Sequence, residues 1–457
     1  MMTTKITSLA QLMQALLANQ PQTLELQTSI LSPYALMLPP GYHLTGADKD
    51  RCCLSFGNGD GLGLTADNEV RDLALLTSPG SRAIYSLTGW EDMGTITLQN
   101  LTVTGQVSVM MRQGTSQLTL VADAVDVVAC DARRYSEQPQ KYGVNAVQGA
   151  FTVYNFSADA KSLLTATLTN ITVGRRNAPV FGSGIFVSGF GDTGGQVRLQ
   201  ALTTGAVYSN GLLPYGTADM ITAGVFIVYG VRAAQVTCQG EVVTYGVNDM
   251  VLDNWGYVQQ WTALAPITSY GPSGIGFVNF GTVETFEARE DVVTYGLGAR
   301  GFNQYDGTVQ QATFKSITTH GDGSIGMQIS KPVGRIEVRE SVTTYGAKGN
   351  SLVKGVVMEL PAEAVSVKPG GEVQELLIGS DLVTHGAQVT TYALGGGKVA
   401  QLHIGGQVLA TGTGATAVAV GQGGSTPLTN VKAAAPAGQV LRNEGGTITD
   451  QTGWLAG

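Results

Sequence analysis

The basic residues of this sequence gather in segments where tyrosines are also frequent. Arginine guanidinium groups bind carboxylates through two parallel hydrogen bonds, so such a cluster suits an anionic ligand. Aromatic faces suit sugar rings, and together the two residue types indicate a groove for an acidic saccharide such as a uronate. The basic residues are Arg133, Arg134, Lys141, Arg175 and Arg176, and the tyrosines are Tyr135, Tyr142, Tyr208 and Tyr215.

The alternative interpretation of this cluster is that exposed loops carry charges by default. The arginines would then pair with acidic residues of the same region, namely Asp131, Glu137 and Asp192.

A second set of candidate residues recurs at an interval of 25 residues. Trp255, Phe280 and Tyr305 would share one outward face and form an aromatic stripe able to bind sugar. Carboxylates beside the stripe could act as general acid or base. Alternatively, the stripe packs under a loop or against a partner subunit. The flanking carboxylates are Asp249, Asp253 and Asp306.

Two further columns of the same region depart from a simple apolar pattern. Arg300 interrupts a column that is otherwise apolar, and we include it among the candidate substrate-binding residues. The polar residues Asn254, Asn279 and Gln304 would face inward, where a ladder of amide hydrogen bonds accounts for them without any function. The apolar members of the interrupted column are Met250, Ile275 and Ile325.

These residues are positioned by a repeat. The phrase Val-Val-Thr-Tyr-Gly, or a close variant, ends at glycines 25 residues apart, and a period of this size is typical of a solenoid. The segments between are short, alternating and rich in Val, Ile, Thr, Phe and Tyr, which predicts strands and turns. Three strands per 25 residues predict one coil of a parallel β-helix. The glycines are Gly246, Gly271, Gly296, Gly321 and Gly346.

Stacked coils place equivalent residues in columns about 4.8 Å apart. The column of valines and isoleucines should point inward, and the column of threonines and serine, two residues further on, lies on the same face. The column of tyrosines and histidine should form a stacked aromatic ladder of structural origin. The columns are Val242, Ile267, Val292, Ile317 and Val342; then Thr244, Ser269, Thr294, Thr319 and Thr344; then Tyr245, Tyr270, Tyr295, His320 and Tyr345.

The remaining chain extends this architecture in both directions. Residues 1–22 predict an amphipathic helix, capped at Ser8, that closes one end of the core. Residues 23–432 form the β-helix, and residues 433–457 form either a final coil or a tail. Inserted loops are expected near 131–142, 175–183, 206–223 and 358–372. Loops on a rigid scaffold are where function usually lies.

Composition excludes several functional classes. The 457 residues carry a formal charge of −8, which gives no electrostatic support for nucleic-acid binding. No segment reaches the roughly 18 apolar residues of a membrane span, and we expect a cytoplasmic protein. The four cysteines show no metal-ligand spacing, and no phosphate-binding loop opens a helix, so neither a metal nor a cofactor is predicted.

The opening of the solenoid carries a family resemblance. A strand followed by Leu-Pro-Pro-Gly, residues 38–41, is similar to the first coils of right-handed parallel β-helix proteins of the pectate-lyase-like superfamily. With the repeats, this resemblance covers nearly the whole chain. It implies an all-β right-handed parallel β-helix with a short capping helix. The superfamily holds lyases, hydrolases, epimerases, adhesins and phage tailspikes.

The resemblance implies a carbohydrate-active or carbohydrate-binding protein, with elimination or epimerisation of an acidic oligosaccharide as the reaction class. Both reactions need a base at C5 and a cation near the carboxylate. Arg175 and Arg176 would neutralise the carboxylate, and Tyr142, Tyr229 or a nearby lysine would act as the base. The alternative is a non-enzymatic scaffold or homo-oligomeric interaction protein, whose aromatic stripe forms a subunit interface.

Overall fold

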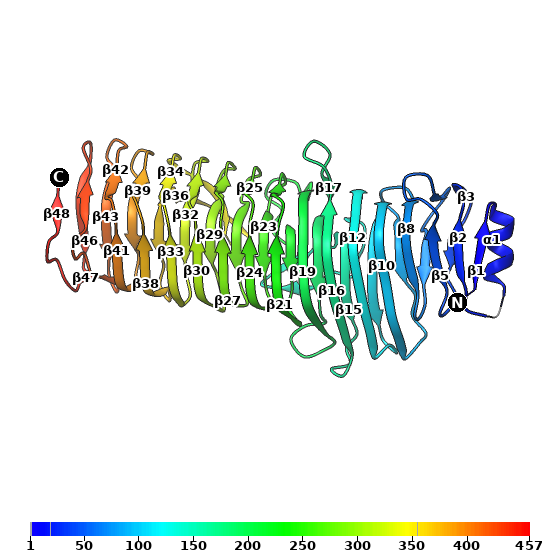
Figure 1. The fold of residues 1–457 in the computed structure, drawn as a ribbon. Coiled ribbons are helices and arrows are strands. Elements are labelled where there is room, and N and C mark those ends of the chain that lie inside the picture. Colours follow the sequence, from blue (N-terminus) through cyan, green and yellow to red (C-terminus); the bar gives the residue numbers. More distant parts are fainter. Residues whose placement is uncertain (1, 19, 354) are drawn as a thin grey trace. The chain divides into compact units, whose positions relative to one another are not determined.

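The computed structural model describes residues 2–18, 20–353 and 355–457, and it divides into two units that are considered separately. Each unit is built from stacked parallel strands, as the sequence predicts for a β-helix (Figure 1). Unit 1 comprises Met1–Pro139, Ala146–Asn210 and Val225–Gln239. Unit 2 comprises Gln140–Asn145, Gly211–Gly224 and Gly240–Gly457.

Each regular coil of unit 2 contains three strands, which confirms the prediction from the repeat. The first strands are β23 (Asp249–Asn254), β26 (Ile275–Asn279), β29 (Arg300–Gln304), β32 (Ile325–Ile329), β37 (Val365–Val367), β40 (Thr390–Leu394), β43 (Thr416–Gly421) and β46 (Gln439–Glu444). The second strands are β24 (Tyr257–Ala263), β27 (Thr282–Ala288), β30 (Thr308–Phe314), β33 (Val333–Val338), β38 (Glu372–Ile378), β41 (Lys398–Ile404), β44 (Ser425–Thr426) and β47 (Thr447–Ile448). The third strands are β22 (Val242–Thr244), β25 (Ile267–Ser269), β28 (Val292–Thr294), β31 (Ile317–Thr319), β34 (Val342–Thr344), β39 (Leu382–Thr384), β42 (Val408–Ala410), β45 (Lys432–Ala434) and β48 (Leu455–Ala456).

The predicted columns are present in the ladder of third strands. Val242 pairs with Ile267, and the same register continues through Val292, Ile317 and Val342. All five side chains are at most 1% exposed, so they form one apolar wall of the core. The threonine and serine column two residues later is also buried, because side chains two apart on a strand share a face.

The glycine that closes each repeat is required by close packing between coils. A Cβ atom built on Gly296 would lie 1.8 Å from the carbonyl oxygen of Gly271, and the equivalent distances at the other closing glycines lie between 1.7 and 2.1 Å. No side chain fits at such a distance from a backbone atom. The invariance of glycine within the repeat therefore follows from the backbone of the preceding coil. These other glycines are Gly271, Gly321, Gly346, Gly386 and Gly412, and the first closing glycine, Gly246, supplies the carbonyl that a Cβ atom on Gly271 would meet.

The aromatic column at this corner forms a continuous stack. Neighbouring rings lie with centroids 4.6–5.4 Å apart and planes within 18° of parallel. The stack confirms the predicted ladder and extends it by one ring, because the repeat returns after an insertion. Its members are Tyr245, Tyr270, Tyr295, His320, Tyr345 and His385.

The predicted amide ladder lies inside the coil. Asn254 Nδ2 donates to Asn279 Oδ1 at 2.7 Å, and Asn279 Nδ2 donates to Gln304 Oε1 at 3.0 Å. Gln304 Nε2 in turn donates to the backbone carbonyl of Asp306 at 3.0 Å. All three amides are 0% exposed. Because each buried amide finds a partner on the next coil or, for Gln304, in the following turn, the polar column is accommodated within the core.

Unit 1 uses longer strands than unit 2. Near the middle of several of them a residue adopts a left-handed backbone, for example Asn100 at φ 51° and Asn170 at φ 55°, which marks the corner of the coil. One ladder runs through β1 (Thr3–Ile6), β2 (Thr23–Leu26), β5 (His43–Gly46), β8 (Glu69–Leu76), β10 (Asp92–Thr104), β12 (Gln117–Ala129), β16 (Leu163–Val173), β19 (Gln196–Asn210) and β21 (Val231–Cys238), and β3 (Ile30–Ser32), β6 (Cys53–Phe56) and β17 (Val180–Phe181) extend it. The other runs through β4 (Leu36–Met37), β7 (Leu62–Leu64), β9 (Arg82–Ser86), β11 (Gln106–Arg112), β15 (Gly149–Phe156), β18 (Ser183–Ser188) and β20 (Met220–Ile227), of which β20 contributes residues to both units.

The N-terminal helix is shorter than the sequence predicts. Helix α1 (Leu9–Leu16) begins after Ser8, whose hydroxyl accepts a hydrogen bond from the Gln11 backbone N–H, so the predicted cap is present. Residues 3–6 form β1 instead of a helical turn, because they pair in parallel with β2. Leu12 of this helix is buried, and α1 packs against β1 and β3. In the described part of the chain, no helix is long and apolar enough to cross a membrane.

The predicted insertion after Gly346 is an antiparallel hairpin that starts earlier than expected. Strands β35 (Lys348–Val353) and β36 (Val356–Pro361) pair with each other, whereas the prediction placed the insertion at 358–372. In unit 2, β13 (Gln140–Lys141) also pairs antiparallel with β14 (Val144–Ala146). Residues 433–457 continue the parallel ladders through β46, β47 and β48, so they form a final coil.

Replacing a closing glycine should destabilise the coil sharply. We expect Gly296→Ala to lower the free energy of unfolding by about 3 kcal/mol, because the new methyl group meets the backbone of the preceding coil. The matched control is Gly395→Ala, since a Cβ atom there meets nothing within 4 Å. Chemical denaturation of both variants checks the prediction, and equal midpoints would contradict it.

Candidate functional site

Two of the predicted arginines of unit 1 are engaged in bidentate ion pairs. Arg133 Nη2 and Nε donate to the two oxygens of Asp131 at 2.7 and 2.9 Å. Arg175 Nη1 and Nη2 donate to the two oxygens of Asp126 at 3.0 and 2.7 Å. The first pair is one of those suggested by the alternative interpretation, and the second joins residues 49 positions apart in the chain.

The other predicted residues of unit 1 are placed as follows. The Arg134 guanidinium lies over the ring of Tyr135 at 5.3 Å, and Arg176 is exposed in the turn after β16. Tyr229 is 8% exposed, and its backbone carbonyl accepts a hydrogen bond from the Gly189 N–H. The predicted catalytic tyrosine of this unit is thus largely buried at a turn between coils.

The aromatic stripe of unit 2 is covered, whereas the sequence analysis placed it on an exposed face. Tyr142 contacts Trp255 edge-on at 5.5 Å between centroids and Phe280 at 4.6 Å, and its hydroxyl donates to the Phe280 carbonyl at 3.1 Å. Phe280 in turn lies 4.6 Å from Tyr305. Trp255 is only 3% exposed. The stripe therefore packs under the segment 140–145, as the alternative interpretation proposed.

Asp249 anchors the start of strand β23. Thr222 Oγ1 donates to one carboxylate oxygen at 2.9 Å, and the backbone N–H groups of Gly211 and Gly246 donate to the other at 3.1 Å each. Burial raises the pKa of Asp249 to about 6, and these hydrogen bonds act in the opposite direction. The carboxylate thus holds loop residues to the coil and is 0% exposed.

Asp253 points out of the coil but is fully buried. Burial raises the pKa of its carboxyl group well above the usual range, and the indole N–H of Trp255 opposes this shift. In register, Asp253 is followed by Val278, Asn303 and Gln328 on the next three strands. This outward column leads from the buried carboxyl group into a pocket.

That pocket, called here the hairpin pocket, is formed entirely by residues of unit 2 and has a volume of about 90 Å³. Its base is formed by first-strand residues, including Arg300, and the hairpin β35–β36 contributes Leu352, Val353 and Gly355. The other lining residues are Tyr142, Val144, Ala218, Ile221, Asn248, Met250, Ser273, Ile275, Val278, Phe280, Asn303 and Tyr305. The structure thus brings together three of the predicted site residues, namely Tyr142, Arg300 and Tyr305.

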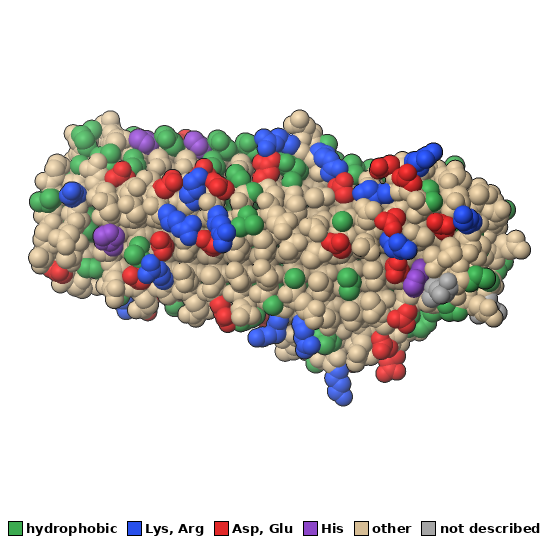
Figure 2. Space-filling view, viewed as in Figure 1, with side chains coloured by type: hydrophobic (Ala, Val, Ile, Leu, Met, Phe, Trp, Pro, Cys, Tyr) green, Lys and Arg blue, Asp and Glu red, His purple; other side chains and the backbone are tan. Residues whose placement is uncertain are grey.

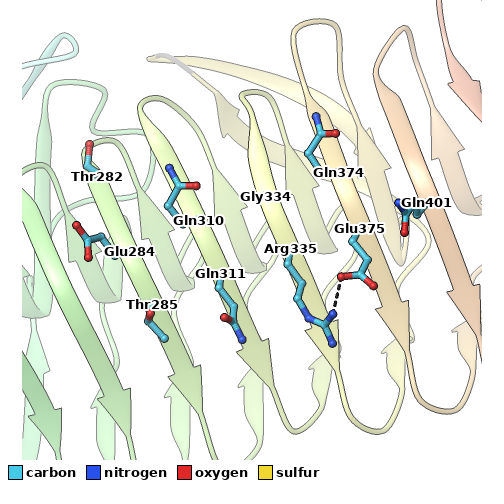
Figure 3. Close-up of a pocket in the computed structure, with 10 residues that line it drawn as sticks. All are labelled: Thr282, Glu284, Thr285, Gln310, Gln311, Gly334, Arg335, Gln374, Glu375 and Gln401. Atoms are coloured by element: carbon cyan, nitrogen blue, oxygen red, sulfur yellow. Dashed lines mark hydrogen bonds and ion pairs between the residues drawn. The ribbon is translucent and has the colours of Figure 1, made fainter.

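A larger site lies on the outer face of the second strands, and sequence reasoning missed it. We call it the polar groove; it has a volume of about 850 Å³ and crosses β27, β30, β33, β38 and β41 (Figure 3). Five neighbouring strands span about 19 Å at the usual strand spacing. The lining residues are Thr282, Glu284, Thr285, Gln310, Gln311, Gly334, Arg335, Gln374, Glu375 and Gln401.

One column of outward side chains runs along the polar groove. Its members pair in consecutive register from one coil to the next, so they lie side by side at the strand spacing. Every member carries a hydrogen-bonding group. The column is Gln260, Thr285, Gln311, Arg335, Glu375 and Gln401.

Charges in the groove are paired with one another. Arg335 forms ion pairs with Glu375 on the next strand and with Glu337 on its own strand, which raise the pKa of the guanidinium. Tyr257 donates a hydrogen bond to Glu284. Figure 2 shows basic and acidic side chains mixed over the face that carries β33 and β38.

A sequence signal for the groove exists. The second strands from β24 to β41 each contain a buried valine, two outward residues and an apolar residue, as in Val-Gln-Gln-Ala at 309–312 and Val-Gln-Glu-Leu at 373–376. The pair of adjacent outward positions breaks strict alternation, and at least one residue of each pair is polar.

Comparison of the chain with family models, with curated proteins and with solved structures gives no match. The class defined by the fold is a parallel β-helix. The candidate sites are therefore interpreted from their own geometry.

Removal of the buried Asp253 charge should stabilise the protein in a pH-dependent manner. The pKa of Asp253 is raised in the folded state, whereas in the unfolded chain it has the ordinary aspartate value of about 4. Above pH 4 the folded protein therefore keeps a proton on Asp253 that the unfolded chain has released. Stability is therefore lost as pH rises from that value through the folded pKa. We expect Asp253→Asn to match the wild type near pH 4 and to unfold several degrees higher at pH 7.

Thermal unfolding at a series of pH values measures this difference. Asp249 contributes its own pH dependence to both proteins and cancels in the comparison. The control is Asp291→Asn, a half-exposed carboxylate paired with Lys315, for which no such stabilisation at pH 7 is expected. A variant less stable than the wild type at pH 7 would contradict the prediction.

Proposed function

We propose that the protein binds a hydroxyl-rich oligosaccharide along the polar groove of unit 2, as a carbohydrate-binding β-helix protein related to the pectate-lyase-like superfamily. The observation that carries the proposal is the unbroken outward column of hydrogen-bonding side chains, one on each successive coil. A linear sugar chain laid across the strands would meet a donor or acceptor at every coil.

The side chains of the groove suit sugar hydroxyl groups. A hydroxyl both donates and accepts, and glutamine amides offer both functions, whereas carboxylates accept and guanidinium groups donate. Gln310, Gln311 and Gln401 are exposed, so their amides are accessible to a ligand without rearrangement of the fold. The strands under the polar groove are held rigidly, because the valine that precedes each outward pair is buried in the core.

The charge of the groove favours a neutral sugar over a uronate. The groove is lined by one guanidinium group, Arg335, and by two carboxylates, Glu284 and Glu375. Arg335 already pairs with Glu375 and with the neighbouring Glu337. A polyanionic chain would meet Glu284, Glu337 and Glu375 and be repelled. An acidic oligosaccharide, which the family resemblance implies, is therefore the comparison ligand, and the exposed loops with Arg175 and Arg176 are its candidate site.

Variants along the column test the proposal. We expect Gln311→Ala and Arg335→Ala each to weaken binding of a neutral oligosaccharide by about tenfold, the equivalent of one hydrogen bond to a neutral or charged partner. Titration calorimetry on a panel of neutral and uronate-bearing oligosaccharides measures the affinities.

The matched control is Gln451→Ala, an exposed glutamine outside the groove, which should bind like the wild type. A double variant, Arg175→Ala with Arg176→Ala, tests the loop site in unit 1. Binding of a uronate that disappears in this double variant, with no effect of the groove variants, would contradict the proposal.

One observation favours the alternative function as an interaction protein. The strand β36 exposes three consecutive apolar residues, Val356 at 61%, Val357 at 45% and Met358 at 45%. Apolar residues at such exposure are typical of surfaces that contact other chains. Light scattering of the purified protein distinguishes the hypotheses: a homo-oligomer dissociated by Val356→Ser together with Met358→Ser, combined with no binding of any sugar, favours the interaction protein.

A further inference from the structure

Arg300 is a buried arginine without a carboxylate partner. It lies on β29 in register between Ile275 and Ile325 and is 4% exposed. Its Nε donates to Gln328 Oε1 at 3.2 Å and its Nη1 donates to the Gly298 carbonyl at 3.3 Å. Throughout residues 2–18, 20–353 and 355–457, no acidic side chain forms an ion pair with it.

This arrangement is energetically unfavourable without a further partner. A guanidinium group has five N–H donors, and only two of them are used here. Charges removed from water are normally paired, because the loss of hydration is large. Burial lowers the pKa of Arg300 to about 10, which shows the same cost, yet the group remains charged at neutral pH.

Arg300 lines the hairpin pocket, so a ligand bound there would lie beside this incompletely paired guanidinium group. Asn303 lines the same pocket, is 2% exposed, and its Oδ1 accepts no hydrogen bond. Apart from these groups the pocket is mainly apolar, with Met250, Ile275 and Val278 from the coil. A cationic donor and an amide thus lie together on an apolar base.

The hairpin that encloses the pocket is fixed to the coils beneath it. Ser351 Oγ donates to the Gly298 carbonyl at 2.8 Å, the same carbonyl that Arg300 uses, and the Leu352 N–H donates to Ser273 Oγ at 3.2 Å. The pocket therefore has a defined shape that does not require closure of a mobile segment.

We propose that the hairpin pocket is a binding site for a small monocarboxylate with an apolar body. The carboxylate pairs with Arg300, and Asn303 Oδ1 accepts a hydrogen bond from an N–H or O–H group of a ligand that carries one. The apolar body packs against the aliphatic and aromatic walls. The volume of about 90 Å³ restricts the site to a small ligand.

This site is independent of the polar groove. The groove lies on second strands, whereas the pocket lies on first strands under the hairpin. Chemistry also separates the two sites, because the groove carries an excess of carboxylates and the pocket carries an uncompensated cation. If no sugar binds to the groove, the inference about the hairpin pocket stands. If no carboxylate binds to the pocket, the proposal for the groove stands.

Calorimetric titration with acetate, propionate, isobutyrate and benzoate, each beside its neutral amide, tests the proposal. We expect at least one carboxylate to bind and its amide not to bind measurably. Arg300→Met should reduce the affinity about 100-fold through loss of the charge-assisted hydrogen bonds, and Arg300→Lys should reduce it by about tenfold. Arg289→Met, which removes an exposed arginine paired with Glu287, should bind like the wild type.

Arg300→Met is expected to fold, because its neighbours in the column are apolar and the buried charge is removed. Without ligand its thermal midpoint should exceed that of the wild type, which verifies folding independently of binding. The proposal is overturned if no carboxylate binds, if the amides bind as well as the carboxylates, or if Arg300→Met retains wild-type affinity.

Discussion

The close stacking of one coil on the next, at a fixed register, is the constraint on which unit 2 depends. A methyl group at the closing glycine would lie within about 2 Å of the carbonyl of the preceding coil, so the backbone alone defines this corner. With the register set at this corner, each residue of a coil lies beside the equivalent residue of the preceding coil. Apolar residues meet apolar residues, amides meet amides and rings meet rings, which is why single columns are uniform in chemistry.

Because each column is uniform, the residues that form the core and the residues that form the binding surface lie in different columns. The inward columns supply the apolar core and the buried amide ladder, so the outward columns of the second strands are not needed for the core. Their hydrogen-bonding side chains form the polar groove. On the first strands, Asp253 and Arg300 are charged groups in otherwise apolar or amide columns, and burial disfavours the charge of both. Departures that cost stability are expected at functional sites.

The periodic parts of the structure could be predicted from the sequence, and the non-periodic parts could not. A spacing of 25 residues determines which side chains share a column, so the Val242 column, the tyrosine ladder and the Asn254–Asn279–Gln304 ladder followed directly. The partner of Arg175 is Asp126 on another coil, and Tyr142 covers Trp255 from 113 positions earlier in the chain. No local pattern encodes such contacts. The polar groove was predictable in principle, because its outward pairs recur with the same period.

The most direct test of the account is a crystal structure of the protein with a neutral oligosaccharide. The account predicts a sugar chain lying across the second strands of unit 2, with hydrogen bonds to Gln311, Arg335 and Gln401 on separate coils. A sugar bound at the loops that carry Arg133 and Arg175, with the second-strand column unoccupied, would contradict it.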